Sequence, residues 1–328
     1  MQGNAGVRIE SAWASDQRHG HMTNLERERL TSIFAAYLPL PAKMEPQLKA
    51  ALEYVLQNPG SLVRPEIVLN VSLAYGFATA RATELAIALE YFHTASLLFD
   101  DLPSMDDAVE RRGQNCVHLE FGEASAVLAA LALINRAYAL VWKAVAECGP
   151  DCRSSGLAYF ERYLGVGGLL NGQSMDLQYD QLPRNLESTE AIAVGKTVAL
   201  VRLTLVLPAI LGGASAEELQ LLDRIAFFWG LSYQIVDDLK DVLQSSQKSG
   251  KTGSRDFALN RPNIALVLGV EGASERLRRM IRIGDTLSRR LIALRPSMMF
   301  LKQLRAELGE KALEITQETC GTCAGGSA

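Results

Sequence analysis

The sequence lacks a cysteine framework, a block of basic residues and a long unbroken apolar segment. Its five cysteines are an odd number in a chain of 328 residues, which favours a reducing compartment over a disulfide-rich secreted protein. The net charge of −4 is nearly balanced and the basic residues are scattered, so nucleic acid is not expected as a partner.

Membrane and targeting segments are also not evident. The first 22 residues are polar and have no apolar core of the kind that a signal peptide or an anchor needs. The most apolar stretch, residues 197–213, contains Arg202 and Pro208 and is too short for a membrane span. We expect a buried helix there, and a cytoplasmic protein without a membrane span.

Helical periodicity covers most of the chain. Apolar residues recur at spacings of three and four from about Leu25 to Leu313, whereas the alternation typical of strands is hard to find. Breaks fall at 58–61, 103–122, 148–152, 211–215 and 244–255, and none is long enough to be an interdomain linker. We expect one all-α domain over residues 23–313, with flexible tails at 1–22 and 314–328.

Two clusters of aspartates each follow an apolar helical segment. Residues 100–106 read DDLPSMD, and residues 237–241 read DDLKD. In the second cluster Asp237 and Asp241 are one helical turn apart, so they repel each other unless a cation lies between them. Mg²⁺ prefers oxygen ligands and usually takes one or two carboxylates together with phosphate oxygens and water. The two clusters therefore predict several Mg²⁺ ions held against a diphosphate.

A solvated acidic face is the simpler interpretation of either cluster alone. Both clusters, however, end apolar helices that we expect to be buried, where an unpaired carboxylate is costly to desolvate. Basic residues also follow closely, as in the pair Arg111 and Arg112. Two such clusters in one chain favour metal binding over the simpler interpretation.

With these motifs the chain resembles the isoprenyl diphosphate synthases, the trans-prenyltransferases that make farnesyl, geranylgeranyl and longer diphosphates. The resemblance extends from about residue 30 to residue 310. Its motifs are, in order, DDLPSMD, RRG at 111–113, FGE at 121–123, NGQSMDL at 171–177, KT at 196–197 and YQIVDDLKD at 233–241. It implies a single-domain helical bundle around a deep central cavity, usually a homodimer, with three Mg²⁺ ions and a bound diphosphate.

The same resemblance implies roles for individual residues. Arg111 would bind the allylic diphosphate and Arg112 the isopentenyl diphosphate, while Lys196 and Lys251 would add positive charge as diphosphate leaves. Either lysine could instead be an ordinary surface residue. The implied Mg²⁺ ligands are Asp100, Asp101, Asp106, Asp237, Asp238 and Asp241.

Thr197 and Gln234 are placed near the allylic cation by the resemblance. Without it, Thr197 is an ordinary helix residue and Gln234 a simple interhelical hydrogen bonder. The product length would depend on Ala95 and Ser96, which lie five and four residues before Asp100. Because both are small, no aromatic side chain closes the cavity, which favours a product of twenty carbons or more.

The second-substrate site departs from the family pattern. Residues 59–65 read PGSLVRP where the family usually has GGKRLRP. Arg64 is kept, but Ser61 replaces the lysine, which removes a charged phosphate contact of about 1.5–3 kcal/mol. His93 retains the remaining position of this site, although a lone histidine on an apolar helix is more often a core residue.

Two further departures lie elsewhere. Leu131 stands where an aspartate is usual, and NRPNIA at 260–265 replaces the expected pattern, leaving Arg261 to keep the charge. The preferred interpretation is a Mg²⁺-dependent prenyltransferase that condenses isopentenyl diphosphate with an allylic diphosphate, making geranylgeranyl diphosphate. The alternatives are a terpene cyclase or diphosphate lyase that ionises a single allylic diphosphate, and a non-catalytic subunit that modulates a prenyl synthase.

Overall fold

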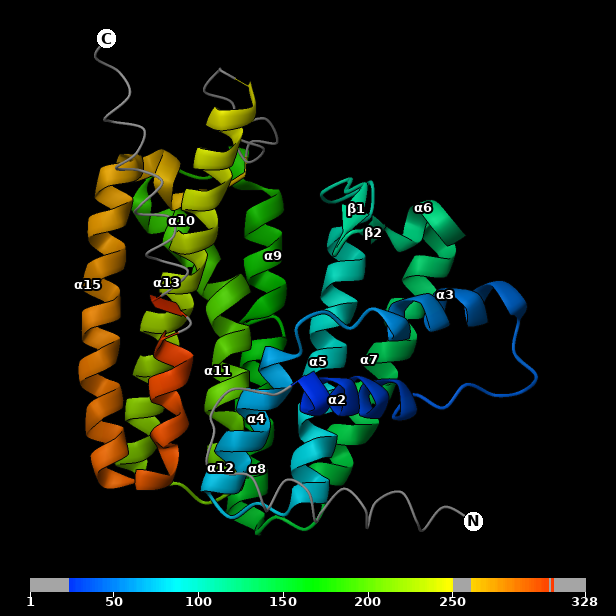
Figure 1. Ribbon diagram of the computed structural model, residues 1–328, viewed down its shortest axis with the longest axis horizontal. Coiled ribbons are helices and arrows are strands. Elements are labelled where there is room, and N and C mark those ends of the chain that lie inside the picture. Colours follow the sequence, from blue (N-terminus) through cyan, green and yellow to red (C-terminus); the bar gives the residue numbers. More distant parts are fainter. Residues whose placement is uncertain (1–23, 250–260, 307, 310–328) are drawn as a thin grey trace. The chain divides into compact units, whose positions relative to one another are not determined.

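The computed structural model describes residues 24–249, 261–306 and 308–309. Helices dominate the described chain (Figure 1). The only strands among the described residues are β1 (Glu110–Arg111) and β2 (Gln114–Asn115), which pair in antiparallel fashion. The prediction of an all-α protein is confirmed.

Two compact units make up the chain, Met1–Arg153 and Ser154–Ala328, and the division falls within α8 (Pro150–Leu164). The single domain over residues 23–313 stays a prediction. The two expected tails, at 1–22 and 314–328, lie outside the described residues.

Unit 1 is built around helix α5. This helix packs against both α4 and α7, and most of its length is buried, which agrees with its apolar sequence. Alanines on the buried face of α7 allow the two helix backbones to approach closely. The helices of this unit are α2 (Asn24–Ala36), α3 (Pro46–Gln57), α4 (Val63–Ala74), α5 (Thr79–Asp100), α6 (Val117–Phe121) and α7 (Glu123–Val145).

The β1–β2 hairpin lies inside a stretch that the sequence predicts only as a break. Its two turn residues, Arg112 and Gly113, have φ values of 57° and 78°. Positive φ at both central positions is typical of the tight hairpin turns whose twist suits paired strands. Gly113 adopts this conformation without cost, whereas Arg112 is held in a region that few non-glycine residues occupy.

Unit 2 is centred on two long helices, α13 and α15, which lie side by side (Figure 1). Their facing apolar residues, among them Leu231, Ile235, Leu239 and Leu277, form one buried cluster. The elements of this unit after α8 are α9 (Leu169–Leu177), η1 (Tyr179–Gln181), α10 (Leu186–Ala193), the π-helical segment η2 (Val194–Val198), α11 (Ala199–Leu205), α12 (Leu207–Leu211), α13 (Ala216–Ser249), α15 (Ile264–Leu294) and η3 (Pro296–Phe300).

The apolar stretch at 197–213 is largely buried, as predicted, but it forms two helices instead of one. The interruption falls at Val206, two residues before Pro208, which cannot donate a backbone hydrogen bond. By length and composition alone, Glu123–Val145 and Leu186–Leu211 could each cross a membrane. This is weak evidence, because core helices pass the same test and 67% of the second window is buried. The absence of a membrane span stays a prediction.

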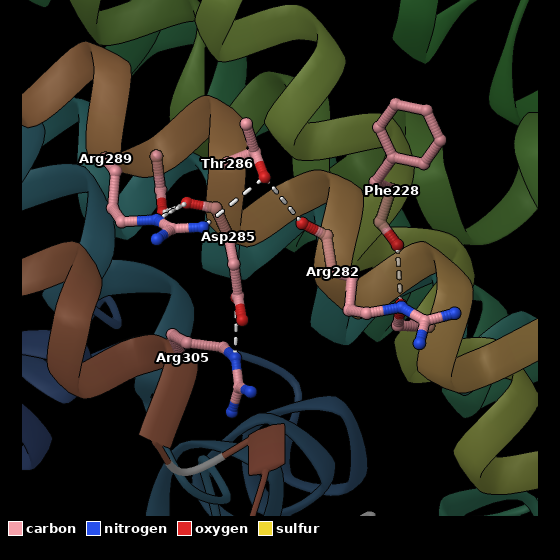
Figure 2. Close-up of polar contacts among 8 residues, drawn as sticks. Phe228, Arg282, Asp285, Thr286, Arg289 and Arg305 are labelled. Carbon is pink, nitrogen blue, oxygen red and sulfur yellow. Dashed lines mark hydrogen bonds and ion pairs between the residues drawn. The ribbon is translucent and has the colours of Figure 1, made fainter.

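Polar contacts fasten the end of the described chain to α15 (Figure 2). Arg305 donates from Nε to Oδ1 of Asp285 at 2.6 Å, across twenty residues of sequence. On α15 itself Arg289 donates to the carbonyl oxygen of Asp285, and Thr286 donates to that of Arg282. The contact of Arg305 with Asp285 holds the helical segment after η3 against α15.

Candidate active site

The first aspartate cluster begins where α5 ends, and its central feature is an ion pair. Asp101 follows the last residue of α5, and only 2% of its surface is exposed. Arg111, on β1, donates from Nε to Oδ1 of Asp101 at 2.9 Å and adds a second bond from its terminal nitrogen. Burial by itself lowers the pKa of Arg111, but the bond to Asp101 outweighs it and the net shift is upward. Asp101 and the arginine that follows it in this stretch therefore form a buried ion pair.

The loop after α5 returns the other acidic residues to the same region. The backbone amide of Asp106 donates to the carbonyl oxygen of Asp100 at 2.9 Å. Both side chains are partly exposed, unlike that of Asp101. A small cavity is lined by Asp101, Arg111 and Thr94, and the buried hydroxyl of Thr94 has no hydrogen-bond partner among the described residues. The three predicted aspartates of this cluster thus lie around one short loop.

Arg112, at the tip of the hairpin, reaches across to the turn between α3 and α4. Its Nη1 donates to the carbonyl oxygen of Asn58 at 2.9 Å. The guanidinium covers Gly60, where a Cβ would come within 2.5 Å of Cζ of Arg112, and Gly60 also has a φ of 79°. The positive φ favours glycine at this position, and the absence of a Cβ lets the Arg112 guanidinium lie directly over the backbone. The contact brings Arg112 to the turn where the resemblance expects the second-substrate site.

Arg64 and His93, the other predicted residues of that site, lie in the same electrostatic environment. Burial lowers the pKa of His93 well below its usual value, and Arg64 and Arg112 lower it further. The imidazole is therefore neutral at pH 7, and its buried Nδ1 has no hydrogen-bond partner within the described part of the chain. Unit 1 thus gathers the residues that sequence reasoning predicted for isopentenyl diphosphate.

Glu90, one turn before His93 on α5, is a member of this group that sequence reasoning missed. It is 2% exposed, and its buried Oε2 has no hydrogen-bond partner in the ranges that the structure describes. Burial raises the pKa of Glu90 to about 7, although Arg64 and Arg112 oppose the shift. The available signal was a carboxylate inside the apolar run LAIALEYF at residues 85–92, three residues before His93.

In unit 2, Asp238 of the second aspartate cluster has a structural role. Asp238 is 2% exposed. Its Oδ2 accepts from the backbone amide of Ile264 at 2.7 Å, and its Oδ1 accepts from Gln234 at 2.8 Å. The side-chain amide of Asn263 also donates to the Asp238 carbonyl oxygen. Asp238 therefore joins α13 to the first turn of α15.

Asp237 and Asp241 lie on a more accessible face of α13. The Asp237 side chain is exposed, and that of Asp241 is partly exposed. Among the described residues, no group of three or more acidic, histidine or cysteine side chains gathers into a metal site. Two carboxylates one turn apart are nevertheless hard oxygen donors of the kind that Mg²⁺ accepts, with phosphate oxygens and water completing its shell. The donor set fits Mg²⁺ bound together with a diphosphate.

Thr197 and Gln234, both predicted from the resemblance, are bonded to each other. Thr197 donates from its hydroxyl to the Gln234 side-chain oxygen at 2.6 Å. Gln234 in turn donates to Asp238, so a chain of hydrogen bonds runs from η2 into the second cluster. Thr197 lies in the π-helical segment, a rare geometry that is frequent at functional sites.

Lys196, on the same segment, pairs with an aspartate that sequence reasoning did not single out. Its Nζ donates to Oδ2 of Asp176 at 2.7 Å, and Arg261 donates to the Asp176 carbonyl oxygen at 3.4 Å. A Cβ on Gly172 would come within 2.5 Å of the backbone at Gly195, so the backbones of α9 and η2 are in contact. The NGQSMDL motif supplies both this glycine and the aspartate.

The remaining predicted residues are Lys251, Ala95 and Ser96. Lys251 lies outside the described residues. Ala95 is fully buried on α5, whereas Ser96 is partly exposed and donates to the carbonyl oxygen of His93 at 2.8 Å. Their proposed effect on product length stays a prediction.

The chain is similar to known proteins in both sequence and fold. Residues 45–291 match the family model described as polyprenyl synthetase. The chain is 33% identical over 284 residues to the chloroplastic geranylfarnesyl diphosphate synthase of Leucosceptrum canum, covering 82% of this chain and 78% of that protein. It is 36% identical to the mitochondrial geranylgeranyl pyrophosphate synthase 10 of Arabidopsis thaliana, covering 72% of this chain and 70% of that protein.

A solved structure of Helicobacter pylori geranyltransferase, complexed with magnesium and isoprenyl diphosphate, is also similar. Its TM-score is 0.75 at 27% sequence identity, and the match covers 86% of this chain and 95% of that one.

Proposed function

The chain belongs to the polyprenyl synthetase family and is a trans-prenyl diphosphate synthase, and from this premise we propose that it condenses isopentenyl diphosphate with an allylic diphosphate to give geranylgeranyl diphosphate. The observation that most favours elongation over cyclisation is the group formed by Arg64, His93 and Arg112 in unit 1. A cyclase that ionises one substrate has no use for this second anion site.

The proposed metal sites use the two aspartate clusters. Mg²⁺, three ions by our proposal, would stabilise the negative charge that develops on the departing diphosphate. Asp238 would contribute chiefly by holding α15 and Gln234, since its carboxylate is buried and bonded on both oxygens. The proposed ligands are Asp100, Asp101, Asp106, Asp237 and Asp241, with Asp238 as a positioning residue beside them.

Basic groups would complete the binding of both diphosphates. Arg111, fixed by Asp101, would contact the allylic diphosphate, and Arg112 the isopentenyl diphosphate, because guanidinium forks suit phosphate oxygens. Lys196 would approach the leaving diphosphate from its pair with Asp176, and Lys251 would do so from outside the described residues. The Thr197 hydroxyl and the Gln234 amide would orient their dipoles towards the allylic cation.

The reaction that these residues would serve breaks a carbon–oxygen bond, forms a carbon–carbon bond and releases a proton. The carbon–oxygen bond of the allylic diphosphate breaks, and the double bond of isopentenyl diphosphate attacks the resulting cation. A proton then leaves the new adduct, with diphosphate as its acceptor. Since charge develops on the departing diphosphate, the positive groups around it supply a large part of the catalysis.

The test is incorporation of labelled isopentenyl diphosphate. The protein would receive Mg²⁺, the labelled substrate and each of the C5, C10, C15 and C20 allylic diphosphates in turn. We expect label in prenyl diphosphates that end at twenty carbons. Hydrocarbon or alcohol formed without uptake of label would replace this proposal by the cyclase. Altered products only when a second prenyl synthase is present would indicate a modulating subunit.

A homodimer is part of the proposal, and α7 supplies its supporting feature. Leu128, Leu131, Tyr138 and Trp142 form a stripe along this helix, and they are 50%, 49%, 53% and 68% exposed. An apolar stripe at helical spacing suits a second helix of the same kind. A second copy of the chain would cover it.

Light scattering after size-exclusion chromatography tests this arrangement. We expect a dimer that becomes monomeric when Leu131→Glu and Trp142→Glu are combined. Val109, 68% exposed but far along the chain from the stripe, gives the matched control, and Val109→Glu should remain dimeric. A monomeric wild-type protein would contradict the proposal.

Localisation is proposed to be cytoplasmic. The printed names of the plant relatives assign them to chloroplasts or mitochondria. The proposal for this chain depends on its five cysteines, an odd number that favours a reducing compartment. Fluorescence microscopy of a C-terminal fusion in the native host tests it, and an organellar signal would contradict it.

A further inference from the structure

We propose that Arg27 is a third cation for the diphosphate of isopentenyl diphosphate, in place of the lysine that is missing at Ser61, an inference that rests on the function proposed above. Arg27 lies on α2, outside every motif that the sequence suggests. Its Nη1 donates to the carbonyl oxygen of Ser61 at 3.2 Å, across 34 residues of sequence. The guanidinium therefore lies at the residue where the resemblance expects a lysine.

Arg112 occupies the other end of the same turn. It donates to the carbonyl oxygen of Asn58 and covers Gly60. Two guanidinium groups from distant parts of the sequence thus contact the four-residue turn 58–61, and Arg64 follows in the first turn of α4. Positive charge is concentrated around this turn, although the turn itself contains no basic residue.

The contact with Ser61 leaves donors for a ligand. A guanidinium has five N–H groups in a planar fork, and one carbonyl oxygen uses one of them. The same fork suits the oxygens of a diphosphate. Helix α4 adds to this effect, since its N-cap residue, Leu62, makes no side-chain hydrogen bond to the first amides of the helix. Arg27 is held through one terminal nitrogen and can still bind an anion with its other N–H groups.

The charge balance at the site also calls for a third cation. Glu90 interacts electrostatically with Arg64 and Arg112 and offsets part of their charge when it is ionised. Diphosphate brings several negative charges of its own. Two arginines beside a carboxylate carry too little net positive charge to neutralise it. The Arg27 guanidinium at Ser61 supplies the positive charge that the missing lysine would have carried.

The test compares four variants in steady-state kinetics with both substrates varied. We expect Arg27→Ala to raise the KM for isopentenyl diphosphate about 10- to 100-fold, the range for a lost charged hydrogen bond. The KM for the allylic diphosphate should stay within about twofold. Ser61→Lys should restore the first KM in the Arg27→Ala background but change it little in the wild type. Lys49→Ala, which removes an exposed cation paired with Glu53 on α3, is the control.

A purely structural role for Arg27 predicts a different result. Arg27→Ala would then lower the melting temperature and affect both substrates equally, and Ser61→Lys would not restore binding. Calorimetric titration with isopentenyl diphosphate alone separates this inference from the proposed function. Weaker binding by Arg27→Ala supports the inference even if the wild type fails to elongate. Equal binding by the two proteins, or none by the wild type, overturns it.

Discussion

Asp238 accepts a hydrogen bond from the backbone amide of Ile264 at 2.7 Å, so the second aspartate of the DDLKD cluster holds the first turn of α15. Asp237, its neighbour in sequence, is exposed. Adjacent residues on a helix are rotated by about 100° from each other, so one of them faces the core while the other faces outwards. Two aspartates that look equivalent in the motif therefore have different tasks.

Substitution should separate these tasks. Asp238→Asn removes a charged acceptor from a buried amide, and we expect it to lower the free energy of unfolding by about 1–3 kcal/mol. Asp237→Asn should leave stability within about 0.5 kcal/mol, as for most surface changes, and lower kcat at least about 100-fold. Urea unfolding and steady-state kinetics of both variants measure this. Equal loss of stability in the two would contradict the assignment.

The buried carboxyl group of Glu90 should make the free energy of unfolding depend on pH. Its pKa is raised from 4.5 to about 7 in the folded protein, chiefly by burial. The folded state therefore binds the proton more tightly than the unfolded state does. The stabilisation is full below pH 4.5 and is lost as the pH rises through about 7, and its size is on the order of 3 kcal/mol.

Glu90→Gln isolates this effect from all other titrations. The variant keeps the shape of the side chain but cannot ionise. We expect its stability relative to the wild type to improve between pH 5 and pH 8, by roughly the amount given by the shift. A constant difference between the two proteins over this range, measured by denaturant unfolding, would mean that Glu90 does not titrate there.

His93 should act as a hydrogen-bonding group and not as a cation. Its pKa is lowered well below 6.5, first by burial and then by the nearby arginines, so it is neutral at pH 7. We expect His93→Gln to bind isopentenyl diphosphate nearly as well as the wild type. His93→Phe should raise the KM roughly 2- to 10-fold, the range for one neutral hydrogen bond. Equal losses in both variants would indicate that charge or ring shape is what matters.

Product length gives a prediction for two adjacent residues of α5. Ser96 is partly exposed, so Ser96→Phe should narrow the space for the growing chain and shift the product from twenty carbons towards fifteen, with little change in melting temperature. Ala95 is fully buried, so Ala95→Phe should overpack the core and cost about 1–3 kcal/mol of stability. Chromatography of the products and thermal unfolding measure the two effects. An unchanged product from Ser96→Phe would contradict its proposed position.

Much of the fold could be predicted because helical periodicity is a strong signal. The long apolar repeats of α5, α7, α13 and α15 predicted an all-α protein correctly. The β1–β2 hairpin was missed because two-residue strands carry no periodicity, and its turn uses Arg-Gly where Asn-Gly or Asp-Gly would be the usual signal. The π-helical segment at Val194–Val198 has no sequence signature of its own.

The candidate site was only partly predictable for a related reason. The order of the motifs predicted Arg64, His93 and Arg112 as site residues. In the structure these three residues lie in the same part of unit 1. Glu90 and Arg27 belong to no motif, and their importance depends on contacts between residues far apart in sequence. Spacing alone also could not distinguish Asp238 from Asp237, because it does not reveal which face of α13 packs against α15.

We propose that both aspartate clusters bind metal around a single diphosphate. A crystal structure with Mn²⁺ and an unreactive allylic thiolodiphosphate tests it most directly, because anomalous scattering locates the ions. We expect metal peaks about 2.1 Å from carboxylate oxygens of Asp100 or Asp101 and of Asp237 or Asp241, with the same diphosphate bound to all of them. Metal at one cluster alone, or a diphosphate bound away from either cluster, would contradict the account.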